Sequence, residues 1–301
     1  MNSINFKHSI LFFYLCILIS PFYLMINYEP IILCLFLILI IGISHGSLDN
    51  LKGKKLLKSF GFKSSLFFYF IYLIICFLII VLWLIFPNTT LLLFLIVAAY
   101  HFGKEDTVFY FKKKFLISEI LFFIKGSSVI VAPLLFQRDA TNEIFKTLNF
   151  YVFESSIFNS QFLLVFLFLS FLSSIYISNK KNVDLKALMI VDFLSLITLN
   201  YFLTPILAFT LYFCFLHSIR HSITLIFELD NSFKKGFKKF ITKAIPLTLI
   251  TGIMFLIAIY FLNNFYKLDE AIYKVIFIGL ASLTFPHILL EYLLEKNEKR
   301  T

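Results

Sequence analysis

The chain has 301 residues, of which 60% are hydrophobic and 15% charged, and its mean hydropathy is +0.92. Soluble domains are roughly half apolar and one quarter charged, so this composition excludes an ordinary soluble enzyme. The net charge of +10 would suit nucleic-acid binding, but the lysines lie in short clusters between apolar stretches, as membrane orientation signals do. We therefore expect a membrane protein with no nucleic-acid partner.

Apolar stretches of about 20 residues recur along the chain, and each is long enough to cross a bilayer core of roughly 30 Å. Each must be a helix, because lipid offers no hydrogen-bond partner to the backbone. We predict an all-α polytopic membrane bundle of about ten transmembrane helices (range eight to ten), with residues 1–301 forming a single integral membrane domain. The predicted spans are 9–27, 31–48, 66–86, 90–103, 115–136, 160–178, 186–202, 205–227, 243–262 and 271–292.

Lysine and arginine residues predict how these spans are oriented. Of the 27 such residues, 21 lie in one set of loops, two lie inside spans, and four lie in the opposite loops, namely Arg138, Lys146, Lys267 and Lys274. Cytoplasmic loops carry the excess of positive charge. The bias therefore places both termini in the cytoplasm, in a multi-pass protein of the inner (plasma) membrane, and it favours an even number of spans.

Histidines are the main functional signal. The chain has six histidines. His8 precedes the first predicted span and is interpreted as incidental, whereas the other five lie toward the cytoplasmic ends of even-numbered spans. At a rise of 1.5 Å per residue, all five fall within roughly 10 Å of a common depth. These five are His45, His101, His217, His221 and His287.

His217 and His221 are four residues apart, so they project from one helix face with the spacing that two imidazoles need to bind one ion. Neutral imidazole suits iron, zinc or copper. Ionisable groups at membrane depth are costly and normally face the bundle interior. The alternative is that each histidine only satisfies a buried hydrogen bond between helices, and five on one level make that the weaker interpretation.

Carboxylates follow most of these histidines. Asp49 is four residues after His45, Glu291 is four after His287, and Glu105 and Asp106 are four and five after His101. A metal-bound imidazole usually donates its other N–H to a carboxylate or carbonyl. A plain interfacial charge at a helix end is the competing explanation.

Other residues near these motifs have structural interpretations. Gly46 and Gly103 would permit close approach of a helix or a ligand, or would simply end their helices. Arg220 is expected to point away from its neighbouring histidines and to snorkel or pair with an acid. Lys125 and Asp192 are candidates for pairing inside the bundle.

Four stretches, taken in order, resemble the Brp/Blh family of bacterial and archaeal β-carotene 15,15′-dioxygenases. The family motifs are matched by His-Gly-x-x-Asp at 45–49, His-Phe-Gly-x-x-Asp at 101–106, His-x-x-x-His at 217–221 and Pro-His-x-x-x-Glu at 286–291. No single motif is specific, but the ordered set is, and it extends over most of the chain.

The resemblance implies cleavage of the central double bond of β-carotene with O2 to give two all-trans-retinal, at a non-haem Fe(2+). By motif, the metal ligands would be His45, His101, His217 and His221. It also implies a lipid-dissolved substrate and a microbial rhodopsin as consumer of the retinal. The residues left as a possible fifth ligand or as support for the ligands are His287, Asp49, Asp106 and Glu291.

Two other classes stay open on the sequence alone: another membrane enzyme, and a non-enzyme that carries haem or transports metal. A membrane di-iron desaturase or hydroxylase usually needs about eight histidines, including paired His-His, which this chain lacks. A haem-bearing carrier would use two histidines on facing helices as axial ligands. A metal transporter would spread polar residues across the full membrane depth rather than one layer.

Overall fold

The computed structural model describes residues 2–23, 25, 29–61, 66–108, 116–178 and 183–298, and within these segments all regular structure is helical. The predicted all-α polytopic membrane fold is confirmed. In the described segments, nine helical stretches are long and apolar enough to cross a membrane. They are Ile4–Tyr23, Ile31–Ser59, Leu66–Ile85, Ile117–Phe136, Ser160–Ser178, Leu185–Phe202, Pro205–Leu229, Phe233–Leu262 and Leu268–Asn297.

The predicted fourth span, 90–103, is not among these nine stretches. It forms part of α5 (Pro87–Val108), a 22-residue helix that is longer than expected. Lys104, Glu105 and Asp106 continue this helix beyond the predicted end and lower its hydropathy, although all three are buried. The helix therefore carries buried polar groups rather than a uniformly apolar surface.

The first helix also differs from the expectation. It begins at Asn2 as α1 (Asn2–Tyr23), so His8 lies inside a helix rather than ahead of one. The His8 Nε2 atom is 2.8 Å from the carbonyl oxygen of Phe215, 207 residues away in sequence. His8 is therefore a packing residue of the bundle, and its predicted position ahead of the first span was wrong.

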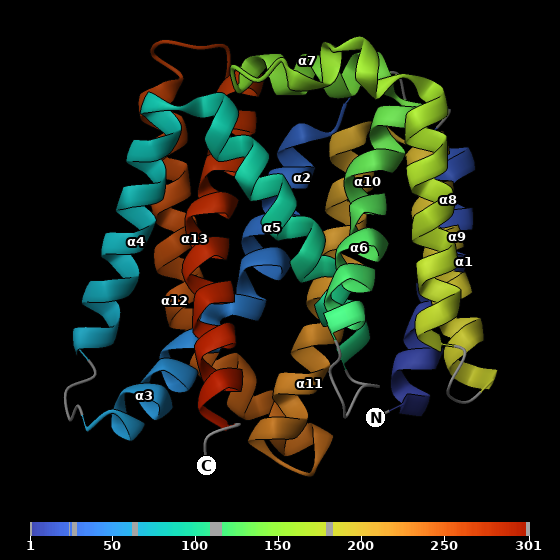
Figure 1. Ribbon diagram of the computed structural model, residues 1–301. Helices are drawn as coiled ribbons and strands as arrows, with labels where there is room; N and C mark the ends of the chain where they lie inside the picture. The colour runs from blue at the N-terminus through green and yellow to red at the C-terminus, as the bar shows by residue number, and fades with distance from the viewer. Residues whose placement is uncertain are drawn as a thin grey trace. The chain divides into compact units, whose positions relative to one another are not determined.

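The described helices form two compact units, and the first spans Met1–Gly42 and Leu95–Leu225. In it α6 packs on α8, α1 packs on α9, and Figure 1 shows α7 running roughly perpendicular to α6 and α8. Besides α1 and the later part of α5, its elements are α2 (Ile31–Leu37), η1 (Ile38–Gly42), α6 (Leu116–Phe136), α7 (Arg138–Thr147), η3 (Val152–Glu154), η4 (Ser156–Phe158), α8 (Ser160–Ser178), α9 (Val183–Phe202), α10 (Pro205–Leu211), η5 (Tyr212–Ser218) and the start of α11 (Ile219–Leu229).

Two local features position the functional part of this unit. Thr204 is extended (ψ 152°) because it precedes Pro205, and this ends α9 and starts α10. Close glycine packing then joins α5 to α6. A Cβ on Gly103 would lie 1.8 Å from the carbonyl oxygen of Phe122, and one on Gly126 would lie 1.8 Å from that of Ala99. Gly103 therefore serves close helix approach, not helix termination.

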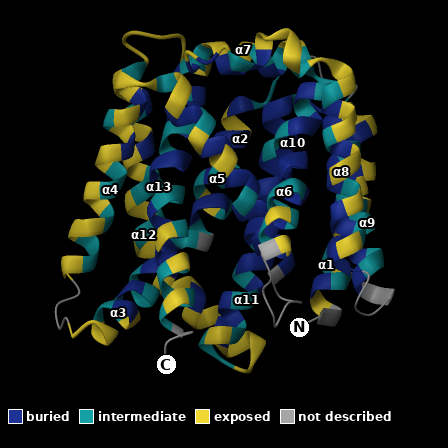
Figure 2. Cartoon of the chain, viewed as in Figure 1, coloured by how far each residue is buried: buried dark blue, intermediate teal, exposed yellow. Residues whose placement is uncertain are grey.

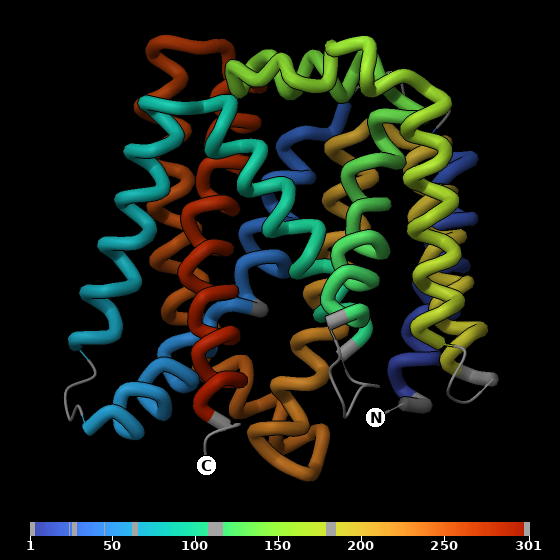
Figure 3. The backbone as a smooth tube through the Cα atoms, viewed as in Figure 1, coloured from blue at the N-terminus to red at the C-terminus, as the bar shows by residue number. Residues whose placement is uncertain are grey.

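The second unit spans Ile43–Phe94 and Ile226–Thr301. In it α4 and α12 pack on α13, and Figure 3 shows α3 running obliquely to α4 and α13. Large hydrophobic side chains are exposed along α4 (yellow and teal in Figure 2) and along α12, as a lipid-facing surface requires. Its elements, besides the start of α5 and the end of α11, are η2 (Ile43–Leu48), α3 (Asp49–Ser59), α4 (Leu66–Ile85), α12 (Phe233–Leu262) and α13 (Leu268–Glu298).

Candidate metal centre

Three of the candidate histidines gather in the first unit. His101 lies on α5, His217 lies near the end of η5, and His221 follows one turn later on α11. The imidazole rings of His101 and His217 are 5.2 Å apart between centroids, and all three side chains are buried. Of the i,i+4 pair, His217 therefore lies beside an imidazole from another helix.

The two adjacent carboxylates of α5 bind the paired histidines of the facing helix. The Nδ1 atom of His217 is 2.9 Å from Asp106 Oδ1, and the Nδ1 atom of His221 is 3.2 Å from Glu105 Oε2. The sequence placed both carboxylates four and five residues after His101 on their own helix, but it did not predict these two contacts with the facing helix. Consecutive residues of α5 point in different directions, and the facing helix presents two imidazoles one turn apart.

A π-helix brings a further residue to Asp106. The Tyr212 hydroxyl donates a 2.6 Å hydrogen bond to Asp106 Oδ2, while His217 occupies the other carboxylate oxygen. In an α-helix, residues five apart point roughly 140° away from each other. The i→i+5 bonding of η5 brings Tyr212 and His217 to the same side instead. Sequence reasoning missed Tyr212, because this spacing signals no shared face in an ordinary helix.

A comparable arrangement lies in the second unit. The Nδ1 atom of His287 on α13 is 2.9 Å from both Oδ1 and Oδ2 of Asp49, the first residue of α3. The Tyr72 hydroxyl of α4 donates to Asp49 Oδ2 at 3.1 Å and to the carbonyl oxygen of Leu283 at 3.3 Å. His287 and Asp49 are both buried.

Glu291 and His45 complete the set of candidates. Glu291 is placed one turn after His287, but its Oε1 atom accepts a 2.7 Å bond from Lys52 Nζ. His45 belongs to η2, and its side chain lies outside the described part of the structure. A Cβ on the neighbouring Gly46 would meet only ordinary contacts, the nearest at 3.9 Å, so this glycine is not needed for close helix packing.

Aromatic side chains surround His217. The ring of Phe102 lies 4.8 Å from the imidazole centroid at nearly a right angle, and the ring of Phe213 lies 5.9 Å away and almost parallel. Phe209 stacks on Phe213 at 5.5 Å. The imidazole of His217 is therefore set among aromatic rings that exclude water.

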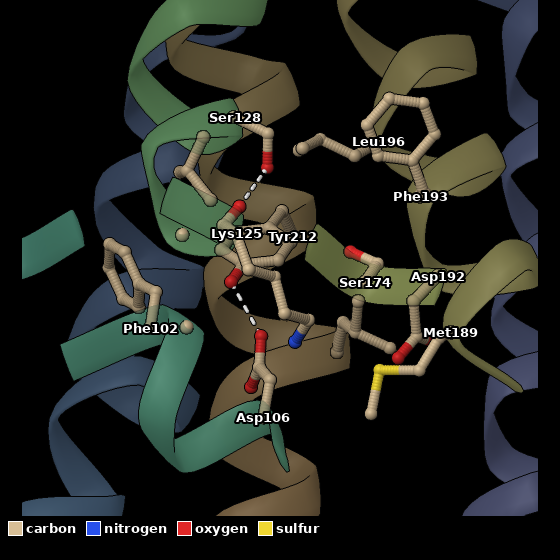
Figure 4. A pocket seen from close by; sticks show the side chains of 14 residues that line it. Phe102, Asp106, Lys125, Ser128, Ser174, Met189, Asp192, Phe193, Leu196 and Tyr212 are labelled. Atoms are coloured by element: carbon tan, nitrogen blue, oxygen red, sulfur yellow. Dashed lines mark hydrogen bonds between the residues drawn. The ribbon is translucent and has the colours of Figure 1, made fainter. Parts of the chain in front are cut away.

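Arg220 and Lys125 are two further buried charges of the first unit. Arg220 donates to both carboxylate oxygens of Asp192, at 2.7 and 2.9 Å, and to the hydroxyl of Ser9 at 2.7 Å. Its expected pairing with an acid is confirmed. Lys125 Nζ donates to Thr107 at 2.9 Å and faces the same cavity as Asp106, Tyr212 and Asp192 (Figure 4).

The donor chemistry fits a transition metal. An imidazole whose Nδ1 is bound to a carboxylate has a fixed tautomer and ring angle, and its Nε2 is then the nitrogen that binds a metal. His217, His221 and His287 all have this arrangement. Neutral imidazole donors in an apolar setting suit iron, copper or zinc rather than calcium or magnesium.

Comparisons with known proteins agree with these motifs. Residues 36–295 match the family described as Beta-carotene 15,15′-dioxygenase, a stretch that contains every histidine of the chain except His8. A curated protein of that name from Uncultured marine bacterium 66A03 is 34% identical over 110 residues. The aligned stretch covers 36% of this chain and only 39% of that relative. No solved structure matches the chain.

Proposed function

Because this chain belongs to the beta-carotene 15,15′-dioxygenase family, we propose that it cleaves the central 15,15′ double bond of β-carotene with O2. The double bond breaks, each carbon gains one oxygen atom, and two molecules of all-trans-retinal leave. This reaction uses all the oxidising equivalents of O2, so it needs no external reductant. The observation that carries the proposal is that His101, His217 and His221 are all buried, that His101 lies beside His217, and that a carboxylate lies on the Nδ1 atoms of His217 and His221.

We propose Fe(2+) as the metal, with His101, His217 and His221 as ligands. His45 is proposed as the fourth ligand from its motif alone. Bound iron would supply the activation of O2. Asp106 and Glu105 would orient the imidazoles, and the aromatic rings around His217 would hold the polyene and keep water out.

The apolar helices support a substrate that arrives from the membrane. β-Carotene dissolves in lipid rather than in water, so an enzyme acting on it benefits from a lipid-facing entrance. The distribution of 27 basic residues supports an inner-membrane location with both termini in the cytoplasm. The retinal would pass to a microbial rhodopsin, which requires it as chromophore.

The test is expression in bacteria that accumulate β-carotene. We expect the wild-type protein to remove the orange colour and produce retinal, and the His217→Ala variant to insert into the membrane without doing either. His8→Gln is the matched control, because it changes a histidine that packs against a backbone carbonyl and should keep its activity. Unchanged carotene with well-expressed, iron-supplied wild-type protein would overturn the proposal.

The family match favours this function over the alternatives left open by the sequence. Metal analysis separates them further. A single-iron dioxygenase should hold one iron per chain, a di-iron desaturase two, and a haem carrier should show a Soret absorption band. A transporter should move metal across vesicles without consuming O2.

A further inference from the structure

A small polar cavity lies inside the first unit, with walls from α5, α6, α8, α9 and η5. Its walls carry two carboxylates, those of Asp106 and Asp192, and one amine, that of Lys125. In Figure 4 the amine of Lys125 lies between the two carboxylates. All three residues are buried, so these charged groups must find their hydrogen-bond partners inside the protein.

The amine of Lys125 can form more hydrogen bonds than the protein gives it. An ammonium group carries three donors. Within the segments that the structure describes, one of them donates to the hydroxyl of Thr107 at 2.9 Å. A donor buried without an acceptor costs about 1–3 kcal/mol, and more when the group is charged. Lys125 therefore needs further acceptors on the side that faces the cavity.

The two carboxylates do not supply these acceptors by direct contact. In the described part of the chain, Asp192 forms its ion pair with Arg220 at 2.7 Å, and Asp106 forms its own with His217 at 2.9 Å. Tyr212 donates to the second oxygen of Asp106. A carboxylate oxygen has two lone pairs, so one hydrogen bond to each oxygen leaves room for another. Polar groups that face one cavity without direct contact can be joined by a bridging water.

The size and the charge of the cavity indicate what occupies it. The space open to the centres of water molecules is about 30 Å³, and one water needs roughly 10–15 Å³, so one or two waters fit. The positive charges of Lys125 and Arg220 balance the negative charges of Asp106 and Asp192, so no additional ion is required. The carboxylates would repel an anion, and the amine would repel a cation. The site therefore fits a small, neutral, polar molecule.

We propose that this cavity is a water-binding site, in which one or two water molecules bridge the amine of Lys125 to the carboxylates of Asp192 and Asp106. Each water accepts a hydrogen bond from Lys125 and donates one to a carboxylate, which joins the charges without direct contact. Such a site allows a charged lysine to remain inside a bundle that spans the membrane. The inference depends neither on a bound metal nor on the substrate.

The first test uses Met189 as a reporter inside the protein. Its side chain lines the cavity, and the residue is 1% exposed. Ionising radiation splits bound water into hydroxyl radicals, which oxidise a sulfur atom beside that water. After brief X-ray irradiation of the full-length protein in detergent, we expect mass spectrometry to find Met189 oxidised. Cys16 is the control, because it also carries a reactive sulfur but is 0% exposed and does not line the cavity, so it should stay unoxidised. Oxidation of Met189 no greater than that of Cys16 would overturn the proposal.

A cavity-filling variant tests whether this oxidation arises in the cavity. Ser174 lies on α8 and lines the cavity, so Ser174→Leu places apolar volume where the water binds and should abolish the oxidation of Met189. Ser178→Leu is the matched control, because Ser178 is also buried on α8 but does not line the cavity. Its Met189 should be oxidised as in the wild-type protein. Wild-type oxidation of Met189 in Ser174→Leu would show that the radicals come from elsewhere.

A second measurement needs no variant to fold. An experimental map of the wild-type protein, at a resolution that shows buried waters, should contain density about 2.5–3.2 Å from both Lys125 Nζ and an oxygen of Asp192 or Asp106. A map that shows other buried waters but none at this position would overturn the proposal. A direct ion pair between Lys125 and Asp192 in that map would overturn it as well.

Discussion

Replacing Arg220 with methionine should strongly destabilise the protein. The Arg220 side chain is 1% exposed, and its hydrogen bonds include two to Asp192 and one to Ser9. Methionine has a similar volume but no donor, so the Asp192 carboxylate would remain buried without its counter-charge. Removing one partner of a buried ion pair costs about 3–5 kcal/mol.

The matched control is a surface pair of the same length. Lys239 Nζ and Asp230 Oδ2 also lie 2.7 Å apart, but the Lys239 side chain is 51% exposed. Water and salt screen such a pair, so Lys239→Met should cost only about 0.2–1 kcal/mol. The two variants therefore compare the stability lost from a buried and from an exposed ion pair of the same length.

The assay is thermal unfolding of the detergent-purified protein, followed by loss of the monodisperse peak in size-exclusion chromatography. One kcal/mol shifts the midpoint by roughly 2–4 °C in proteins of 150–250 residues, so Arg220→Met should lower it by about 6 to 20 °C. Lys239→Met should lower it by no more than about 4 °C.

The double variant Arg220→Met with Asp192→Leu tests the cause. Replacing both charges with apolar groups removes the unpaired carboxylate, so most of the lost stability should return. A midpoint for Arg220→Met equal to that of Lys239→Met would refute the argument, and so would a double variant less stable than Arg220→Met.

Two further predictions concern Gly103 and Glu105 of α5. Gly103→Ala should lower the free energy of unfolding by about 1–3 kcal/mol or more, because its Cβ would lie 1.8 Å from the carbonyl oxygen of Phe122. Gly252→Ala, the control, places its Cβ in open space and should raise the free energy of unfolding by up to about 1 kcal/mol. Thermal unfolding of both variants checks this, and equal midpoints would contradict it. Glu105→Gln should weaken Fe(2+) binding roughly tenfold, measured by anaerobic titration in competition with a chelator, because Glu105 orients the His221 imidazole. The unfolding midpoint of the metal-free protein should stay nearly unchanged. An unaltered iron affinity would show that Glu105 does not orient His221 for metal binding.

Membrane spans were predictable because their cause is local. A stretch such as 66–86 must become a helix wherever lipid surrounds it, and α4 occupies Leu66–Ile85 almost as expected. Misplaced boundaries occurred where polar residues belong to a helix interior. Glu105 and Asp106 extend α5, and His8 lies within α1, because buried partners from distant segments satisfy these side chains.

The sequence by itself determined that the chain forms apolar helices, and it singled out the histidines as candidates for a metal. Which carboxylate serves which imidazole was decided only by tertiary structure. Asp106 bonds to His217, 111 residues away, although His101 is only five residues away in sequence. Asp49 bonds to His287, 238 residues away, although His45 is only four residues away in sequence. Helical spacing describes the face of one helix, but a side chain bonds to whatever the neighbouring helix presents. The π-helix that places Tyr212 beside His217 depends on that packing as well.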